Sequence, residues 1–444
     1  MFFISDFFRA GTPALMVAVA LAPSVQSAWA ADVGLSLAQT QRMAVERSRL
    51  LEAQDAAATV SRSMAIAAGQ LPDPVLRLGL DNLPADGADR FNVTRDFMTM
   101  RRIGVMQEFT RSEKRELRAQ RFENEADKAL AEKAVLVAAI QRDAALAWLD
   151  RYYAEATAAV IAEQAKEVKL EIVAAEGAYR GGRGNQADVF AAHSALVALE
   201  DRASELDRRI RTAKTGLARW IGDGADVPLA SRPAIDSIRL DTGALETQLA
   251  HDPQIAVFSK QEDIASTEVR LAQANKKSDW SLEVAYQQRG PAFSNMVSIG
   301  VSIPLQWDQK NRQDREVAAK LAMAEQAKAQ REEALRARIG EMHAMVAEWE
   351  NGRERLARYA RELIPFAKER TQAALAAYAG GKSSLTDLLL ARRNEIDVRT
   401  QAVQLEMETA RLWAQLNFLF PDSVGTTHTS VLVHPTENQP KDTK

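Results

Sequence analysis

Apolar residues recur at helical spacing over most of this chain. After Arg111, for example, they return every three or four positions, as at Leu130, Ala134 and Val137, with Arg, Glu, Lys and Gln between them. Such a period predicts amphipathic helices that pack as coiled coils. Six helical stretches are predicted on this basis: residues 37–70, 111–179, 186–221, 242–277, 309–378 and 385–420.

The predicted helices come in two lengths. Two have about 70 residues, which corresponds to roughly 100 Å, and the other four have about half as many. Two short helices laid end to end therefore match one long helix. A single hairpin of this kind cannot bury enough surface to be stable, so the helices need one another and further subunits.

Two segments, residues 73–109 and 279–305, have a period of two instead. Leu282, Val284 and Tyr286 lie on one side of an extended chain, and the residues between them lie on the other. This alternation is typical of a soluble strand on a core and of a membrane-spanning strand with one lipid face. A hairpin at the end of a very long helix has no core to lie on, so we favour lipid. Three chains would supply about twelve strands, enough for a water-filled barrel.

A sequence repeat relates the two halves of the chain. Residues 178–191 return as 377–390 in one register, with the same tyrosine, two glycines and aspartate in each copy: Tyr179, Gly181, Gly182 and Asp188, then Tyr378, Gly380, Gly381 and Asp387. A repeat of about 200 residues is too long for a solenoid unit and indicates internal pseudo-symmetry. We assign residues 31–221 and 242–420 to two structural repeats, and residues 222–241 to a linker.

The two ends of the chain differ from the rest. Ala28-Trp29-Ala30 follows an apolar run and has the small-x-small pattern of a signal-peptide cleavage site. Residues 1–30 are therefore predicted to be an export signal rather than an N-terminal anchor. No later segment approaches the ~20 apolar residues of a transmembrane helix. Residues 421–444 are predicted to be a polar, poorly ordered tail.

Composition and spacing exclude several function classes. Charged residues make up 26% of the 444 residues but nearly cancel to a net charge of −3, so nucleic acid is not an expected partner. The chain has no cysteine, which excludes disulfides and thiolate metal sites. No His, Asp and Glu residues have zinc-site spacing. Gly181-Gly-Arg-Gly184 follows a helix rather than the strand that a phosphate loop requires. We expect no cofactor, no metal site and no enzymatic activity.

The chain resembles the TolC-like outer-membrane factors of tripartite efflux systems, from about residue 36 to residue 420. The repeated Ala-Tyr-x-x-Gly turn is a signature of that whole family. Three features resemble its heavy-metal (CzcC/CusC-type) branch: Leu71-Pro-Asp-Pro74, Asn82-Leu-Pro84, and Ile103-Gly-Val-Met-Gln-Glu-Phe109 before the basic Lys114-Arg115.

This resemblance implies a fold, partners and a location. It implies a homotrimer with a twelve-stranded β-barrel in outer-membrane lipid and a long α-helical coiled-coil tunnel in the periplasm. A periplasmic adaptor (membrane fusion) protein would join the tunnel to an inner-membrane RND pump. The chain would be a passive duct for heavy-metal cations. The same channel could instead carry drugs, solvents or secreted polypeptide. A soluble periplasmic coiled-coil scaffold or adaptor is the alternative from another class.

The two Gly-Gly turns are expected at the periplasmic tip of the tunnel. Gly181, Gly182, Gly380 and Gly381 suit left-handed positions that end a helix. The resemblance adds that adaptors contact this tip.

Asp188 and Asp387 each stand three residues after a predicted N-cap. A structural role in a capping box therefore explains both aspartates as well as a role in the pore does. The resemblance places Asp387 in a ring of carboxylates that narrows the pore. It places Tyr378 and Asp188 in bonds that close the tip. Leu390 stands where two-ring members have a second aspartate, which argues against a second ring here.

Pro365 interrupts the second long helix about thirteen residues before its tip, where the first repeat has Lys166. A proline inside a helix removes a hydrogen bond and produces a kink. We expect the hairpin that contains Pro365 to bend when the pore opens. A static kink that shapes the taper of the tunnel is the alternative.

Overall fold

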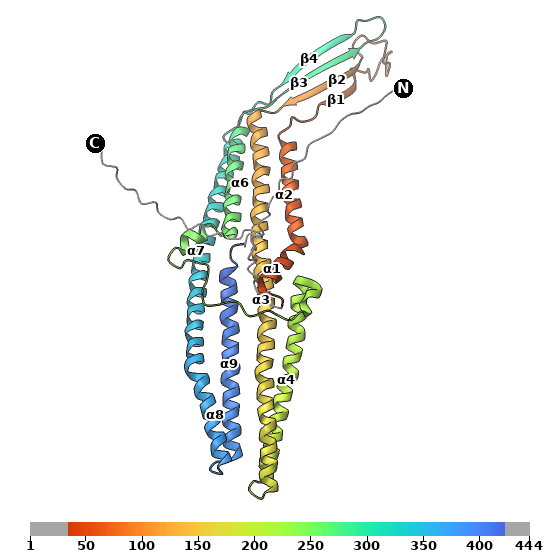
Figure 1. The fold of residues 1–444 in the computed structure, drawn as a ribbon. Coiled ribbons are helices and arrows are strands. Elements are labelled where there is room, and N and C mark those ends of the chain that lie inside the picture. Colours follow the sequence, from red (N-terminus) through yellow and green to blue (C-terminus); the bar gives the residue numbers. More distant parts are fainter. Residues whose placement is uncertain (1–33, 422–444) are drawn as a thin grey trace, which may run out of the picture.

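The computed structural model describes residues 34–421, so the predicted signal peptide and the predicted tail beyond Pro421 lie outside the described residues. Long helices run side by side along one axis. A four-stranded sheet extends from one end, and two tight turns that connect helices form the other end (Figure 1). The helices have these bounds: α1 Leu37–Glu46, α2 Arg49–Ala68, α3 Ser112–Arg180, α4 Gln186–Ile221, α5 Leu245–Leu249, α6 Pro253–Asn275, α7 Gln313–Arg358, α8 Ile364–Ala379 and α9 Leu385–Asn417.

Helix α3 is the central element. Its 69 residues correspond to roughly 100 Å. It packs against α2 and α6 near the sheet and against α4 and α9 near the turns (Figure 1). The short helices are thus stacked end to end beside it, α2 above α4 and α6 above α9.

Three of the predicted helices are divided: residues 309–378 by a π-helical turn at Tyr359–Leu363, and the other two as follows. The stretch predicted as 242–277 contains the short α5, and α6 begins only at Pro253, with Asp252 as its N-cap. Proline has no N–H and restricts the residue before it, so a helix starts there rather than running through. The stretch predicted as 37–70 divides at Arg47 and Ser48 into α1 and α2. This break lies beside residues 222–241: the Arg47 side chain contacts Gly222, and Leu35, just before α1, pairs with Leu229 in a parallel bridge.

Residues 222–241, predicted to link the two repeats, cross the middle of the bundle, and tryptophan side chains hold them there by hydrogen bonds. The indole N–H of Trp349 donates to Ile235 O at 3.2 Å, and that of Trp413 donates to Ser237 O at 2.9 Å. Trp148 donates in the same way to Leu35 O at 2.9 Å. All three rings belong to the largest buried apolar cluster among the described residues, so the core lies at the level of the linker.

The sheet is antiparallel, with the strand order β1-β2-β3-β4. The strands are β1 Val75–Asp81, β2 Met100–Phe109, β3 Trp280–Gln288 and β4 Met296–Ser302. The β2–β3 pair joins the two halves of the chain, with Val105 opposite Val284.

The register gives the sheet one apolar face and one polar face. The apolar face carries Leu76, Leu78, Leu80, Ile103, Val105, Leu282, Val284, Tyr286, Val297, Ile299 and Val301, and the polar side chains on it are Gln107 and, at the end away from the helices, Arg101 and Gln288. The polar face carries Arg77, Asp81, Arg102, Glu283, Gln287 and Ser298. No described element covers the apolar face, and Ile299 is 72% exposed.

Candidate functional site at the hairpin tips

The two turns at the far end of the bundle share one backbone geometry. In the α3–α4 turn, Arg183 N donates to Ala178 O at 2.9 Å, and in the α8–α9 turn Lys382 N donates to Ala377 O at 2.8 Å. The second glycine of each pair has a positive φ, +69° and +68°, as in a Schellman motif.

The first glycine of each pair does not adopt the expected left-handed conformation. Gly181 and Gly380 both have φ −81° and form the C-caps of α3 and α8. Only Gly182 and Gly381 are left-handed, because the Schellman motif requires a single left-handed residue.

Asp188 and Asp387 each complete a capping box at the start of the next helix. Asp188 N donates to Asn185 Oδ1 at 2.8 Å, and Asp387 N donates to Ser384 Oγ at 3.2 Å. The Ser384 hydroxyl also donates to Asp387 Oδ2 at 2.7 Å. Hydrogen bonds from the Ser384 side chain and backbone lower the pKa of Asp387, so this carboxylate is ionised at neutral pH.

Tyr378 is one of the residues that link the two hairpins at this end. It packs against a second buried apolar cluster, close to the hairpin tips, which contains Val168 and Ile172 of α3 and Leu388 of α9. Burial, followed by the negative charge of Asp188, raises the pKa of the Tyr378 phenol. The structure thus brings Tyr378 near Asp188, although within residues 34–421 no hydrogen bond joins them. Asp387 and Leu390 are exposed on α9, and Leu390 is 58% exposed.

Pro365 lies directly after an irregular turn. Residues Tyr359–Leu363 form a π-helical turn, in which Ile364 N donates to Tyr359 O, and α8 then carries Pro365 in its first turn. The path of the chain changes direction between α7 and α8 (Figure 1). A groove of about 1020 Å³ lies beside this turn and is lined by Arg232 and Glu406, which form an ion pair.

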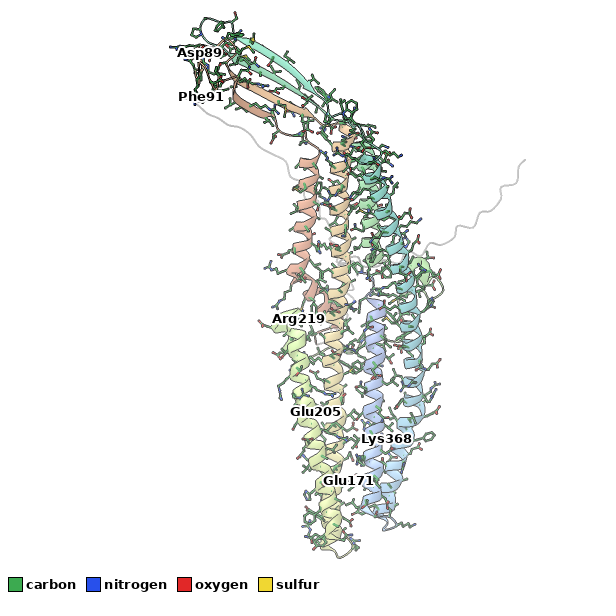
Figure 2. The ribbon with its side chains drawn as sticks, turned by 180° about the vertical axis from the view of Figure 1, so that it is seen from behind. Asp89, Phe91, Glu171, Glu205, Arg219 and Lys368 are labelled. Atoms are coloured by element: carbon green, nitrogen blue, oxygen red, sulfur yellow. The ribbon has the colours of Figure 1, made fainter. Side chains whose placement is uncertain are left out.

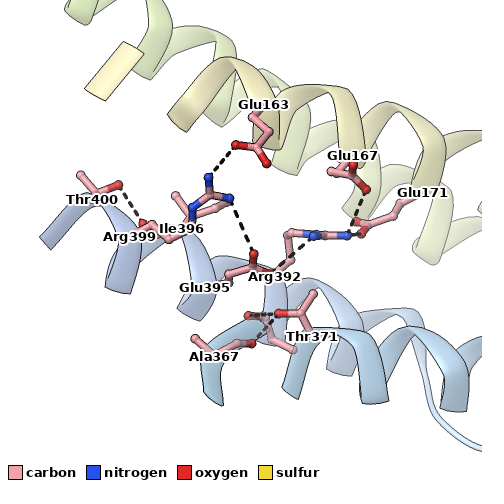
Figure 3. Close-up of polar contacts among 11 residues, drawn as sticks. Glu163, Glu167, Glu171, Ala367, Thr371, Arg392, Glu395, Ile396, Arg399 and Thr400 are labelled. Carbon is pink, nitrogen blue, oxygen red and sulfur yellow. Dashed lines mark hydrogen bonds and ion pairs between the residues drawn. The ribbon is translucent and has the colours of Figure 1, made fainter. Parts of the chain in front are cut away.

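A buried charged cluster between α3 and α9 was not predicted. Glu171 lies toward the hairpin end of the molecule, opposite the end that carries Asp89 and Phe91 (Figure 2). There it accepts two hydrogen bonds from Arg392 of α9, and Glu395 lies beside the same guanidinium (Figure 3). The sequence did hold a signal: Arg392 occupies a position of the apolar stripe formed by Leu388 and Ile396.

Metal-ligand groups and membrane-spanning helices are both absent from the described part of the chain. Within residues 34–421, no group of three or more His, Asp or Glu side chains is placed to hold a metal ion. None of the helices in that range is both long enough and apolar enough to cross a membrane.

Comparison with known proteins identifies the fold. No protein-family model and no curated protein sequence matches the chain. Among solved structures, the outer-membrane channel OprN matches with a TM-score of 0.72 at 19% identity, over 87% of this chain and 90% of that chain. The outer-membrane protein VceC from Vibrio cholerae matches with a TM-score of 0.69 at 19% identity, over 86% and 95%. CusC, studied for its transmembrane channel formation, gives 0.72 at 15% identity, over 87% and 92%.

These matches show the fold class. Residues 34–421 are mainly helical with four antiparallel strands and have the fold of these outer-membrane channels. The match to CusC and the match to OprN have the same TM-score, so the fold does not single out one of these channels.

Proposed function

We propose that this chain is the outer-membrane channel of a tripartite efflux system. The observation that carries the proposal is the apolar face of the sheet. Three neighbouring strands present Val105, Val284 and Ile299 on this face, between 45% and 72% exposed. Apolar surface of this extent needs a partner. Because the polar face holds ion pairs such as Arg77–Glu283, lipid on one side and water on the other fit the sheet.

Aromatic side chains support the same interpretation. Phe109 and Trp280 stack with ring centroids 4.3 Å apart, at the end of the sheet where it meets the helices. Trp307, 88% exposed, follows β4 at a position that continues the odd-numbered apolar series of Val301 and Ile303. Tryptophans at such a level are typical of the boundary between lipid and water.

Closure of the sheet requires further copies of the chain. The outer edges of β1 and β4 are unpaired within the described residues, and an unpaired edge is not tolerated in lipid. Three copies supply about twelve strands, enough for a barrel with an aqueous lumen. We therefore propose a homotrimer in which three pairs of helical hairpins continue the barrel as a periplasmic tunnel.

The hairpin tips are proposed as the regulated end of that tunnel. In the proposed channel, an adaptor protein contacts the two turns formed by Gly181, Gly182, Gly380 and Gly381. An inner-membrane RND pump supplies the energy. Asp387 contributes one ring of carboxylates, while Tyr378 and Asp188 approach each other where the two hairpins meet. The duct itself carries out no chemical step.

The proposed cargo is a heavy-metal cation, and the sequence around β1 supports this choice. Leu71-Pro-Asp-Pro74 and Asn82-Leu-Pro84 flank that strand and resemble the heavy-metal branch. A conduit should bind its ions weakly, because a tight site would stop transport. Asp387 is a suitable weak contact, since it is exposed and ionised.

Two experiments test the proposal at its two levels. Heat-modifiable trimers in purified outer membranes are expected for a channel, whereas a purely soluble periplasmic protein would contradict it. A deletion strain should lose resistance to one or a few metal ions in a metal-by-metal profile. Unchanged metal resistance with a lost tolerance of drugs or solvents would retain the channel and reject the metal cargo.

A further inference from the structure

A charge imbalance is buried between α3 and α9, close to the hairpin tips. Arg392 is 8% exposed and lies between Glu171 of α3 and Glu395 of α9, which are each 4% exposed. Arg392 Nε and Nη2 donate to Glu171 Oε1 at 3.1 and 2.9 Å, and Nη1 lies 3.6 Å from Glu395 Oε2 (Figure 3). One buried cation is therefore paired with two buried carboxylates, and its charge can balance only one of them.

Each of these carboxylates also has an oxygen without a hydrogen-bond partner. The two atoms are Glu171 Oε2 and Glu395 Oε2. A buried carboxylate with an unpaired oxygen is destabilised in its ionised form, and one proton would remove the excess charge. Burial, the largest effect, raises the pKa of Glu171 above its ordinary value, although Arg392 opposes the change. Glu171 thus holds a proton more tightly in this packed arrangement than in water.

The other charges on α3 and α9 do not neutralise the pair. Glu167 lies 3.6 Å from Arg392 Nη2 but adds a further negative charge. Arg399 is the second cation, and it pairs with the exposed Glu163. Its Nη1 reaches Glu395 Oε1 only at 3.8 Å.

Helices α8 and α4 contribute no counter-ion to the pair. Lys368 of α8 acts on the same exposed glutamate as Arg399 and lowers its pKa. Among the described residues of α4, His193 lies 3.5 Å from Glu176, and Arg202 lies 3.8 Å from Asp397. The excess negative charge is therefore a local property of the α3–α9 contact.

We propose that Glu171, Arg392 and Glu395 form a proton-dependent clasp, which positions α9 against α3 and holds the second hairpin in place while Glu171 carries a proton. The inference rests on the proposed channel function, because it gives the clasp a part in opening the tips. The packed state binds the proton more tightly than a state in which Glu171 meets water. Acid therefore tightens the clasp, and rising pH loosens it as Glu171 ionises. A clasp made only of ion pairs would respond in the opposite direction.

The test compares two isosteric variants of the full-length protein. Single-channel recordings in planar bilayers, with pH varied on the side of the hairpin tips, should show an open probability that rises with pH. The closed-to-open ratio should change by about tenfold for each unit of pKa difference between the two states. Glu171→Gln should stay closed at every pH. Asp397→Asn, which removes a half-exposed carboxylate of α9 that is paired across to Arg202 of α4, should respond as the wild type does.

A second measurement is independent of conductance. The protection of the amide hydrogens in residues 388–399, corrected for the intrinsic pH dependence of exchange, should increase on acidification in the wild type and should be high at every pH in Glu171→Gln. Opening on acidification, or a wild-type pH response in Glu171→Gln, would overturn the clasp. Absence of any conductance at any pH would instead count against the proposed channel, while the exchange data would still decide the clasp.

Discussion

A lysine on the apolar face of the sheet should prevent assembly, whereas a lysine at the preceding residue should not. Ile299 lies in the middle of β4, is 72% exposed, and is opposite Val284. Ser298 points to the polar face and is opposite Ala285. The two positions share the strand, the local backbone and the sequence context, so Ile299→Lys and Ser298→Lys differ only in the face that receives the charge.

The expected magnitude follows from the proposed position of Ile299 near the middle of the lipid layer. A lysine there costs about 2–4 kcal/mol per chain, and about three times as much in a trimer. That sum is comparable to the whole stability of an ordinary domain, about 5–15 kcal/mol. Ser298→Lys would place its charge in an aqueous lumen at little cost, beyond the loss of the hydrogen bond from Gln287 Nε2 to Ser298 Oγ at 3.2 Å.

The assay is the amount of heat-modifiable trimer in purified outer membranes, read from unheated and heated samples on a gel. Ile299→Lys should reduce it by more than tenfold, and Ser298→Lys should leave it within about twofold of the wild type. Equal losses in both variants would refute the assignment of the two faces. Normal trimer from Ile299→Lys would refute the lipid contact itself.

Three further predictions concern the helices. Pro365→Ala should supply the N–H that the proline lacks, allow the π-turn to become regular α-helix, and change channel conductance and efflux; unchanged values would reject Pro365 as a hinge. Gly381→Ala should cost about 1–2 kcal/mol in urea unfolding because φ is +68°, whereas Gly380→Ala, with φ −81°, should be neutral; equal effects would contradict the turn geometry. Trp349→Phe should lower the free energy of unfolding by about 1–3 kcal/mol, since it leaves the buried Ile235 carbonyl without its donor. Trp307→Phe, at an 88% exposed position, is the matched control, and an equal loss there would reject the argument.

Long regular elements could be predicted from the sequence because their signals are local and repeated. Helix α4 has the predicted bounds, Gln186 to Ile221, since Asn185 supplies a cap and Gly222 ends the apolar period. The alternation in residues 280–288 likewise matches β3. The break at Pro253 was missed, although Asp252-Pro253 is a recognisable helix start.

Other features depend on contacts between distant parts of the chain and could not be predicted. The break between α1 and α2 contains neither proline nor glycine, and it lies where the linker crosses the bundle. The pairing of Arg392 with Glu171 joins residues more than two hundred positions apart. A charged residue in an apolar stripe indicates that something unusual is buried, but the partner is defined only by the packing of α9 on α3.

The most direct test of the account is whether the edge strands of different copies meet in a closed ring of three. The chain has no cysteine, so Gly79→Cys on β1 and Gly300→Cys on β4 can be combined without background. Within one chain these strands are three strand spacings apart, about 14 Å, which is beyond the reach of a disulfide. A thiol cross-linker shorter than that distance, applied to intact outer membranes, should give covalent dimers and trimers and nothing larger. Monomers alone, or a ladder that continues beyond three, would contradict the trimeric barrel.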